Sequence, residues 1–359
     1  MRRARPEKTA RLADVAKAAG VSQGTVSNVF NRPELVREEV REHVRAVATQ
    51  IGYRGPDPKG RLLRAGKFNA IGVATAEPLR YFFEDPFARV LMGGMSEACD
   101  AAGAGLSLVS AINDERLAWN IESALVDGFV LLCVEGGERL VELTRQRQLP
   151  FVALALGKPD PTISAVGSDD HAGARLMAEH LVGLGHRDFA VLSLELTDGH
   201  VGFVSEADTE RATYSTSSDR IRGAFEVFRS HGIDVSTIPI WETENDAPTT
   251  IAGLEAIFAR PQRPTALVCM SDRVAMIALD WLASRGIAVP GEISVAGYDG
   301  VPEAAMTVPP LTTVTQPIAG IGRRAVEIIL GGSGEIQRET LPLELTVRAS
   351  TGPAPRQGR

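Results

Sequence analysis

Beyond residue 68 the sequence alternates short apolar runs with longer amphipathic segments, and this alternation restricts the fold more than any other feature. The strand-like runs are AIGVATA, GLSLVSA, GFVLLCV and PFVALAL, followed later by FAVLSL, ALVCMS and SVAGYD. Helical spacing occurs between them, near residues 87–103, 115–126, 137–148, 171–184, 219–231, 248–259 and 272–285. Because strands that alternate with helices form parallel sheets, we predict an α/β body of two doubly wound parallel-sheet subdomains.

Charge divides the chain at the same point. Residues 1–68 hold 15 Lys and Arg against 7 Asp and Glu, whereas the remainder holds 23 against 38. The net charge of −7 therefore combines a basic head with an acidic body. Such asymmetry is typical of a nucleic-acid-binding or membrane-binding head.

Other features exclude several classes of protein. No apolar run approaches the length of a membrane span, and the N-terminus lacks the apolar block of a secretory signal, so we expect a cytoplasmic protein without membrane contact. Cys99, Cys133 and Cys269 are far apart and lack CxxC spacing, which indicates small buried hydrophobic residues. The histidines His171, His180, His186 and His200 share no metal-ligand motif, so we expect no metal and no cofactor.

The head contains the pattern of three short helices. Apolar residues at Leu12, Val15, Ala16 and Ala19 predict a first helix that Gly20 ends. Ser22 is a suitable N-cap for a second helix, in which Val26 and Val29 form an apolar stripe before Asn31-Arg32-Pro33 ends it. A third helix follows, with its apolar positions at Val36, Val40, Val44, Val47 and Ile51, and ends at Gly52.

The tight turn between the first two helices indicates an N-terminal all-α helix-turn-helix head, whose second helix reads bases in the major groove. The alternative is that these three helices only pack together as an ordinary helical domain. The basic charge of the head favours DNA binding. Downstream, Asp57 and Pro58 can start a short helix that carries Lys59, Arg61 and Arg64 around Leu62-Leu63. Cations around an exposed leucine suit a minor-groove wedge, although the leucines alternatively pack on the next domain.

Several quoted segments together resemble one known family. RLADVAKAAGVSQGTVSNVFNRPELV, IGY and LLRAGKFNAIGV are similar to the head and hinge of the LacI/GalR family of bacterial transcriptional regulators, named after the lactose repressor. The resemblance continues through AEHLVGLGHRDFAVL, RPTALVCMSD, ISVAGYDG and PPLTTVTQP, so it covers nearly the whole chain.

The resemblance implies the DNA-binding residues. Gln23, Gly24 and Asn28 fall on base-reading positions, and Leu63 on the leucine that intercalates in the minor groove. Ser22, Thr25 and Ser27 fall on positions that face phosphate, and the expected set is completed by Asn31, Tyr53, Lys59, Arg61 and Arg64. Gly24 offers no side chain to a base, so readout passes to Gln23 and Asn28, whose amides suit adenine. Gly60 stands in place of the usual alanine and makes the hinge helix less stable without DNA.

The resemblance also implies the domain organisation. We expect a DNA-binding domain at 1–56, a hinge at 57–68, and an effector-binding and dimerisation domain at 69–359 that is periplasmic-binding-protein-like. Its N-subdomain would span about 69–167 and 318–336, and its C-subdomain about 168–317 and 337–350. No long heptad follows Thr346, so a homodimer is expected rather than a tetramer.

The resemblance further implies an effector pocket between the subdomains, for which five residues are candidates: Phe87, Arg220, Asp272, Asp299 and Gln316. The alternative for each is an exposed ion pair or a helix N-cap, and for Asp272 capping and ligand contact are equally supported. The segment ALALGK lacks the aspartate of lactose-type members. A longer segment between Thr197 and Ser218 is expected near the pocket mouth.

Together these features predict a DNA-binding transcriptional regulator, more specifically a repressor that binds a near-palindromic operator and responds to a sugar or sugar derivative. A nucleoside-responsive, purine-responsive or activating regulator is an alternative. A solute-binding protein without DNA regulation would lack the basic head. We expect no enzyme, because GxGxxG, P-loop and GxSxG motifs are absent. The segment SDDH, residues 168–171, contains the residue types of a catalytic triad, but neighbours in sequence cannot be arranged as one. Asp169 and Asp170 are better placed to cap a helix.

Overall fold

The computed structural model describes residues 10–55, 66–112, 114–132, 138–154 and 160–355. Internal contacts divide the chain into two units, Met1–Phe68 and Asn69–Arg359. We call them the head and the body. In the described part of the chain no helix combines the length and apolar character needed to span a membrane.

The head consists of α1 (Leu12–Ala19), α2 (Gln23–Asn31) and α3 (Glu38–Gln50), with a 3-10 turn, η1 (Pro33–Leu35), before α3. Gly20 ends α1 in the left-handed conformation, at φ 66°. The Ser22 hydroxyl accepts the Thr25 N–H at 3.0 Å and caps α2. The first two predicted helices are thus confirmed, whereas Val36 lies before α3 because η1 delays its start.

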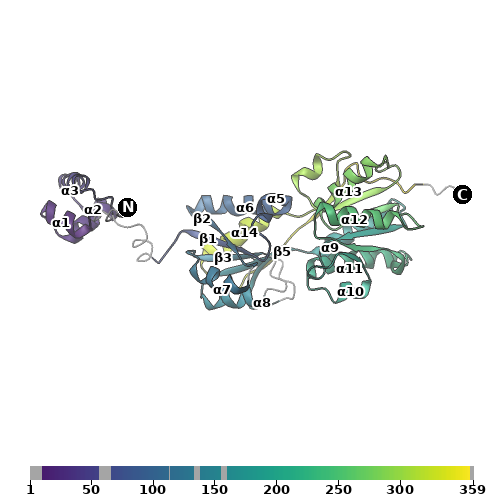
Figure 1. Cartoon of the computed structure of the whole chain (residues 1–359), viewed down its shortest axis with the longest axis horizontal. Coiled ribbons are helices and arrows are strands. Elements are labelled where there is room, and N and C mark those ends of the chain that lie inside the picture. Colours follow the sequence, from purple (N-terminus) through teal and green to yellow (C-terminus); the bar gives the residue numbers. More distant parts are fainter. Residues whose placement is uncertain (1–9, 56–65, 113, 133–137, 155–159, 356–359) are drawn as a thin grey trace, which may run out of the picture. The chain divides into compact units, whose positions relative to one another are not determined.

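The first half of the body, here called the first lobe, is built on a six-stranded sheet. Its strands are β1 (Ala70–Thr75), β2 (Gly105–Ser110), β3 (Gly128–Leu132), β4 (Phe151–Leu154), β5 (Ser164–Ser168) and β12 (Arg338–Leu341), in the order β12-β5-β4-β3-β1-β2. All pairs are parallel. Figure 1 shows the helices of this lobe on both faces of the sheet, namely α5 (Tyr81–Glu84), α6 (Pro86–Ala102), α7 (Asp114–Ser123), α8 (Glu138–Gln146) and α14 (Ile318–Gly331).

The second lobe is built on a seven-stranded sheet in the order β13-β11-β10-β9-β6-β8-β7. Its strands are β6 (Phe189–Ser193), β7 (Gly202–Val204), β8 (Ile240–Glu242), β9 (Ala266–Cys269), β10 (Ser294–Asp299), β11 (Thr312–Thr315) and β13 (Glu344–Thr346). Its helices are α9 (Asp170–Gly183), α10 (Glu206–Glu210), α11 (Ser215–Ser230), α12 (Ala247–Phe258) and α13 (Asp272–Ser284), with 3-10 turns η2 (Val235–Thr237) and η3 (Pro302–Ala305). The prediction of parallel sheets holds for the central strands, but the edge strands β7 and β13 pair antiparallel.

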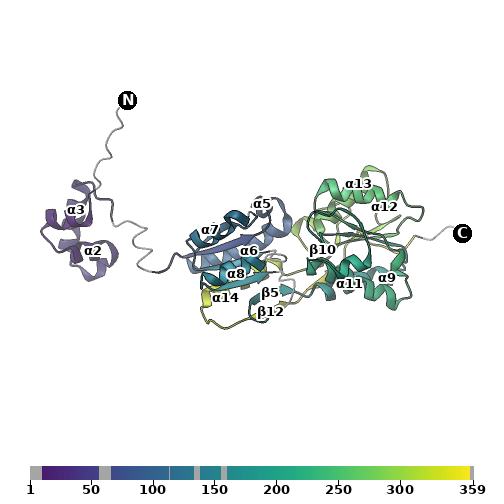
Figure 2. The same cartoon turned by 60° about the horizontal axis from the view of Figure 1, so that its bottom comes forward.

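The chain crosses between the lobes three times: from β5 to α9, from β11 to α14, and from β12 to β13. The first two crossings lie where the sequence predicts them. The prediction that the chain returns to the second lobe at residue 337 is wrong, because Arg338–Leu341 pairs in parallel with β5 before the chain leaves the first lobe. Figure 2 shows β5 and β12 side by side.

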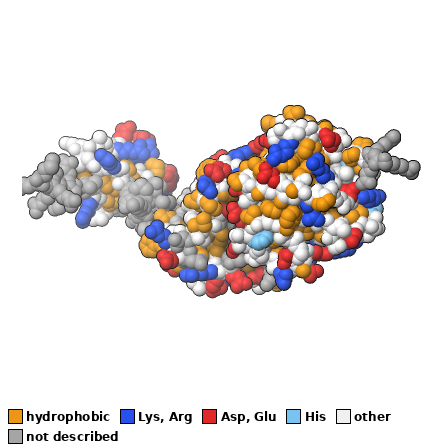
Figure 3. All heavy atoms as spheres, turned by 45° about the vertical axis from the view of Figure 1, so that its right-hand side comes forward, with side chains coloured by type: hydrophobic (Ala, Val, Ile, Leu, Met, Phe, Trp, Pro, Cys, Tyr) orange, Lys and Arg blue, Asp and Glu red, His pale blue; other side chains and the backbone are white. Residues whose placement is uncertain are grey.

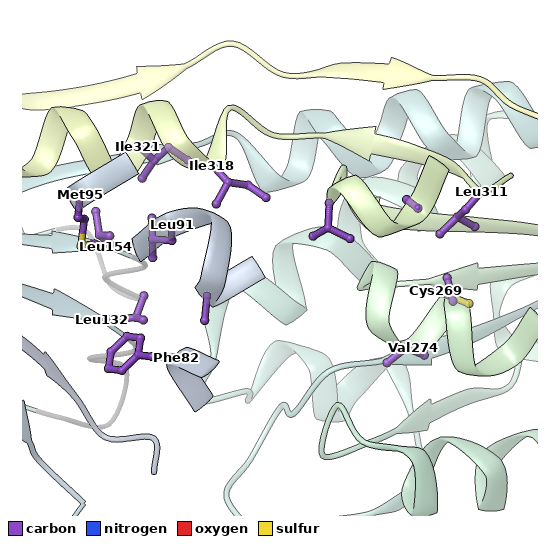
Figure 4. Packing of buried hydrophobic residues seen from close by; sticks show 14 of the residues in the cluster. Phe82, Leu91, Met95, Leu132, Leu154, Cys269, Val274, Leu311, Ile318 and Ile321 are labelled. Carbon is purple, nitrogen blue, oxygen red and sulfur yellow. The ribbon is translucent and has the colours of Figure 1, made fainter. Parts of the chain in front are cut away.

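Helices α6 and α14 approach closely on one face of the first sheet. A side chain on Gly94 would collide with the backbone carbonyl of Ala319, and one on Gly322 with that of Leu91. Leu91, Met95 and Ile321 fill the space beside these glycines (Figure 4). The contact therefore depends on glycine because two helix backbones meet there.

The adjacent glycines of α6 allow a matched test. Gly94→Ala is expected to lower the free energy of unfolding by about 1–3 kcal/mol, because the added methyl group overpacks the contact with α14. Gly93→Ala should instead raise it by roughly 0.5–1 kcal/mol, since no atom lies near its added methyl group and alanine favours the helix. Denaturant unfolding of both variants measures the two values, and equal effects would contradict the packing described.

Candidate functional site

A cavity of about 780 Å³ lies between the two lobes. Its walls include residues at the carboxyl ends of parallel strands from both sheets, among them Leu132, Leu154, Ser168 and Asp299. This edge is where open α/β sheets bind ligands, and the volume suits one small molecule.

Arg220 is the central polar residue of the cavity wall. It belongs to α11, is only 4% exposed, and its Nε donates to Asp170 Oδ1 at 2.8 Å. Its Nη1 lies 3.5 Å from Asp299 Oδ1 and donates to the carbonyl oxygen of Met270. The guanidinium carbon lies 3.7 Å from the centre of the Tyr298 ring, in a cation–π contact.

The charges of this cluster are coupled. Burial opposes the charge on Arg220, but Asp170 and Asp299 outweigh it and raise the Arg220 pKa. Burial also raises the pKa of Asp170 and Asp299, and Arg220 offsets only part of that effect. The cluster thus holds a permanently charged guanidinium group between two carboxyl groups whose pKa values are raised.

Gln316 connects this cluster to the crossings between the lobes. Its Nε2 donates to Asp299 Oδ1 at 3.0 Å, and its Oε1 accepts from the Ser168 hydroxyl at 2.5 Å. Ser168 ends β5 and Gln316 follows β11, so this bond joins two crossings. Phe87, at the start of α6, adds an aromatic side chain to the wall. The cavity lining therefore includes Phe87, Arg220, Asp299 and Gln316 together.

Asp272 is not part of this wall. It is completely buried, and its Oδ2 accepts the N–H groups of Gly300 at 2.7 Å and Val301 at 2.9 Å. Its Oδ1 accepts from the Thr313 hydroxyl. The alternative prediction, that Asp272 caps α13, is also wrong, because the N-cap of α13 is Ser271, whose hydroxyl accepts the Val274 N–H. Asp272 fixes the loop after β10, since its carboxylate is turned away from the cavity.

Among the carboxylates of the wall that were not predicted from the sequence, three come shortly after strands. Glu77 follows β1, Glu195 follows β6 and Glu244 follows β8, and all three line the cavity. Burial raises the pKa of Glu195 to about 7, with further contributions from the charges of Glu77 and Glu244. The strand ends were a usable signal, because parallel strands bring such residues to one edge.

The longer segment between Thr197 and Ser218 contributes Tyr214, Ser215, Thr216 and Ser217 to the lining, in agreement with its expected place near the pocket. The Tyr214 hydroxyl donates to Asp198. The two ends of this segment are thus tied together beside the acidic wall.

Asp85 bridges the lobes beside the cavity. Its Oδ1 accepts the Ala88 N–H and caps α6, while its Oδ2 accepts from Asn245 Nδ2 at 3.1 Å. Arg273 Nη1 lies 3.5 Å from the same oxygen. A second ion pair, between Arg89 and Glu303, also joins the lobes. These contacts connect α6 to the second lobe independently of the three crossings.

The predicted roles of the other titratable residues are resolved where the structure describes them. Asp169 caps α9 by accepting the Ala172 N–H at 2.9 Å, whereas Asp170 pairs with Arg220 and is not a cap. Cys99 and Cys269 are free and buried, and Cys133 lies outside the described residues. No group of three His, Cys, Asp or Glu in the described ranges can hold a metal ion.

In the head, α2 presents the residues expected to contact DNA. Val26 and Val29 are fully buried, which leaves Gln23 and Gly24 exposed and Asn28 half-buried on the same short helix. Further contacts hold the other expected residues: Thr25 bonds to Ser22, Asn31 Nδ2 donates to Ser27, and Tyr53 packs edge-on against Phe30. Lys59, Arg61, Leu63 and Arg64 lie outside the described residues.

Comparison with protein families gives two matches. Residues 11–55 match the model described as "Bacterial regulatory proteins, lacI family", and residues 178–351 match the "Periplasmic binding protein-like domain". The HTH-type transcriptional regulator Rv3575c of Mycobacterium tuberculosis is 39% identical over 97% of this chain and 98% of its own length. The HTH-type transcriptional regulator IpsA of Corynebacterium glutamicum is 33% identical over 89% of this chain and 90% of its own.

Solved structures agree with these matches. The lac repressor dimer bound to operator and the anti-inducer ONPF is 25% identical, with a TM-score of 0.76, over 96% of this chain and 100% of that one. The transcriptional regulator CelR in complex with cellobiose is also 25% identical, with a TM-score of 0.69, over 95% and 99% of the two chains.

The acidic wall predicts an unusual dependence of stability on pH. Glu195 has a raised pKa in the folded protein, so its ionisation lowers the free energy of unfolding as pH rises from about 4.5 towards 7. Four other carboxylates surround Glu195, namely Glu77, Glu242, Glu244 and Asp198. Two of them have hydrogen-bond partners, because His200 is bonded to Glu242 and the Tyr214 hydroxyl donates to Asp198. Glu195→Gln should therefore raise the melting temperature at pH 8 and much less at pH 5. Thermal denaturation across this range measures the difference, and a constant difference would contradict the raised pKa.

Proposed function

Because the chain belongs to the lacI family of bacterial regulatory proteins and is thus a DNA-binding transcriptional regulator, we propose that it is a repressor controlled by a small effector. In this proposal a homodimer binds a near-palindromic operator in the bacterial cytoplasm, where the DNA is. The observation that carries the proposal is the combination of an exposed polar face on α2 with a polar cavity between two lobes.

On the DNA side, we assign base readout to Gln23 and Asn28. Both side chains carry an amide that can donate and accept hydrogen bonds at one adenine edge, while Gly24 carries no side chain. The hydroxyl groups of Thr25 and Ser27 lie on α2 and that of Ser22 at its N-cap, and all three suit phosphate contacts. The selectivity of the operator would then depend on two amide side chains for each head.

On the effector side, we propose a polyhydroxylated ligand such as a sugar or sugar derivative. Arg220, Asp299 and Gln316 supply donors and acceptors for hydroxyl groups, and Phe87 supplies an apolar surface for the face of a ring. The cellobiose complex of CelR supports this class of ligand.

The crossings between the lobes suggest how the cavity acts on DNA binding. An effector that binds one arrangement of the lobes better than another shifts the population towards it. Gln316 and Ser168 join two crossings at the cavity wall, so a ligand at Asp299 would act on the segments that set the angle between the lobes. The effector changes operator affinity only by its differential affinity for the two arrangements.

The homodimer is supported by apolar side chains on the surface of the body. Phe83, Met306 and Val308 are 67%, 74% and 88% exposed and are among the most exposed large hydrophobic residues of the described body. Figure 3 shows hydrophobic side chains gathered over one face of the body. We propose that a second copy of the chain covers Phe83, Met306 and Val308.

Asn28→Ala tests the DNA-reading role. It should weaken binding to the preferred operator by about 1–3 kcal/mol and relax the preference at one base pair of each half-site. Ser27→Ala is the matched comparison, because loss of a phosphate contact weakens all sequences alike. Selection of bound sequences from randomised DNA measures both effects, and an unchanged preferred sequence in Asn28→Ala would refute the assignment.

The dimer is tested by placing charges on its proposed surface. The double variant Met306→Glu/Val308→Glu should dissociate to monomers at concentrations where the unaltered protein is dimeric, because carboxylates would be buried without partners. Ile336→Glu, at an exposed position on the loop before β12, serves as the control. Sedimentation velocity reports the mass of each, and a double variant that stays dimeric would exclude this surface.

A further inference from the structure

The cavity is strongly acidic. Its described lining residues include ten carboxylates and four arginines. The carboxylates are Glu77, Glu84, Asp85, Asp170, Glu195, Asp219, Glu244, Asp246, Asp299 and Glu339, and the arginines are Arg80, Arg220, Arg273 and Arg338. Burial raises the pKa of Glu77, Asp170, Glu195 and Asp299, but the other six carboxylates alone still outnumber the four arginines. The field in the cavity therefore attracts cations and repels anions.

Each arginine of the wall already has a partner within the protein. Arg220 is held by Asp170 and Asp299, and Arg273 by Asp85. Arg338 donates to the carbonyl oxygens of Asp160 and Ile163. Arg80 lies 3.8 Å from Glu84. These contacts compensate the charge of Arg80, Arg220 and Arg273 and engage Nη1 of Arg338, so they weaken the attraction of the four arginines for a phosphate or carboxylate ligand.

By contrast, four carboxylates of the wall form no ion pair within the described part of the chain. One of them, Asp246, is bound to Thr249 as the N-cap of α12, and the others are Glu77 of the first lobe and Glu195 and Glu244 of the second. Glu77, Glu195 and Glu244 line the same cavity, so carboxylates from both lobes share it, and the charges of Glu77 and Glu244 raise the Glu195 pKa. Their mutual repulsion opposes the approach of the lobes.

We propose that the effector carries a protonated amine as well as hydroxyl groups, and that its ammonium group lies between Glu77 and Glu195. The class is an amino sugar or a similar polyhydroxylated amine. This inference rests on the proposed function, since it names the ligand of the same cavity. The hydroxyl groups face Arg220, Asp299 and Gln316, and the ammonium group faces the carboxylates at the other part of the wall.

An organic cation fits this wall better than a metal ion. No three acidic, histidine or cysteine side chains within the described ranges converge closely enough to hold a metal. An ammonium group needs no fixed coordination number and forms up to three hydrogen bonds, so dispersed carboxylates suffice. Because its partners come from both lobes, the ammonium group removes the repulsion between them and favours their approach.

The test compares matched ligands on the full-length chain. Glucose, galactose and ribose are each titrated beside their amino-substituted and phosphate-substituted forms by isothermal calorimetry at pH 7. In at least one trio the amine should bind about tenfold more tightly than its neutral parent, the size of one partly screened ion pair, and the phosphate should bind more weakly than both.

Variants assign this preference to the wall. Glu195→Gln and Glu77→Gln should each remove most of the preference for the amine and leave affinity for the neutral parent nearly unchanged. Glu122→Gln, an exposed carboxylate on α7, should preserve the preference. Equal affinity for amine and parent in every trio, absence of binding included, would overturn the inference, as would a preference that survives both wall variants.

The same titrations separate this inference from the proposed function. If neutral sugars bind as tightly as their amines and the triple variant Arg220→Met/Asp170→Asn/Asp299→Asn abolishes that binding, the sugar-responsive cavity stands while the preference for an amine fails. If neither series binds, both fail.

Discussion

The buried charge of Arg220 is the interaction on which the rest of the body depends. It joins α11 to the start of α9 through Asp170 and to the end of β10 through Asp299, so three elements of the second lobe meet at one guanidinium group. Buried ion pairs contribute little net stability, because desolvation offsets their attraction, yet loss of one partner costs about 3–5 kcal/mol. A small net contribution to stability is compatible with the ligand-binding role that we propose for the cluster. Its place beside Gln316 puts that charge next to the segments that connect the lobes.

Two opposing interactions act between the lobes. Asp85 with Asn245 and Arg273, and Arg89 with Glu303, draw the lobes together beside α6. Glu77 and Glu195 repel each other across the cavity. A balance of this kind suits a regulator, because a ligand then needs only modest differential affinity to change the arrangement of the lobes. Within the first lobe, α6 and α14 are in backbone contact at Gly94, so α6, which carries Asp85 at its start, is packed directly against a helix that begins at a crossing.

Local sequence signals predicted the elements whose causes are local. Gly20 and Ser22 determine the end of α1 and the start of α2 within a few residues, and both predictions are confirmed. The edge strands β7 and β13 were not predicted as antiparallel, because the direction of an edge strand depends on a partner far along the chain. Asp272 looked like a cap or a ligand contact from its neighbours, but its bonds to Gly300, Val301 and Thr313 decide its role. Glu77 and Glu195 are 118 positions apart and meet only through the topology of two sheets.

The most direct test of the account is transcription from the selected operator in cells grown on different carbon and nitrogen sources. The triple variant Arg220→Met/Asp170→Asn/Asp299→Asn removes the buried charges as a set, so no uncompensated charge is left in the second lobe. The account predicts that this variant still occupies the operator and represses equally in every medium, while the unaltered chain releases the operator in some. If repression by the triple variant still changed with the carbon or nitrogen source, the central role of this cavity would be contradicted.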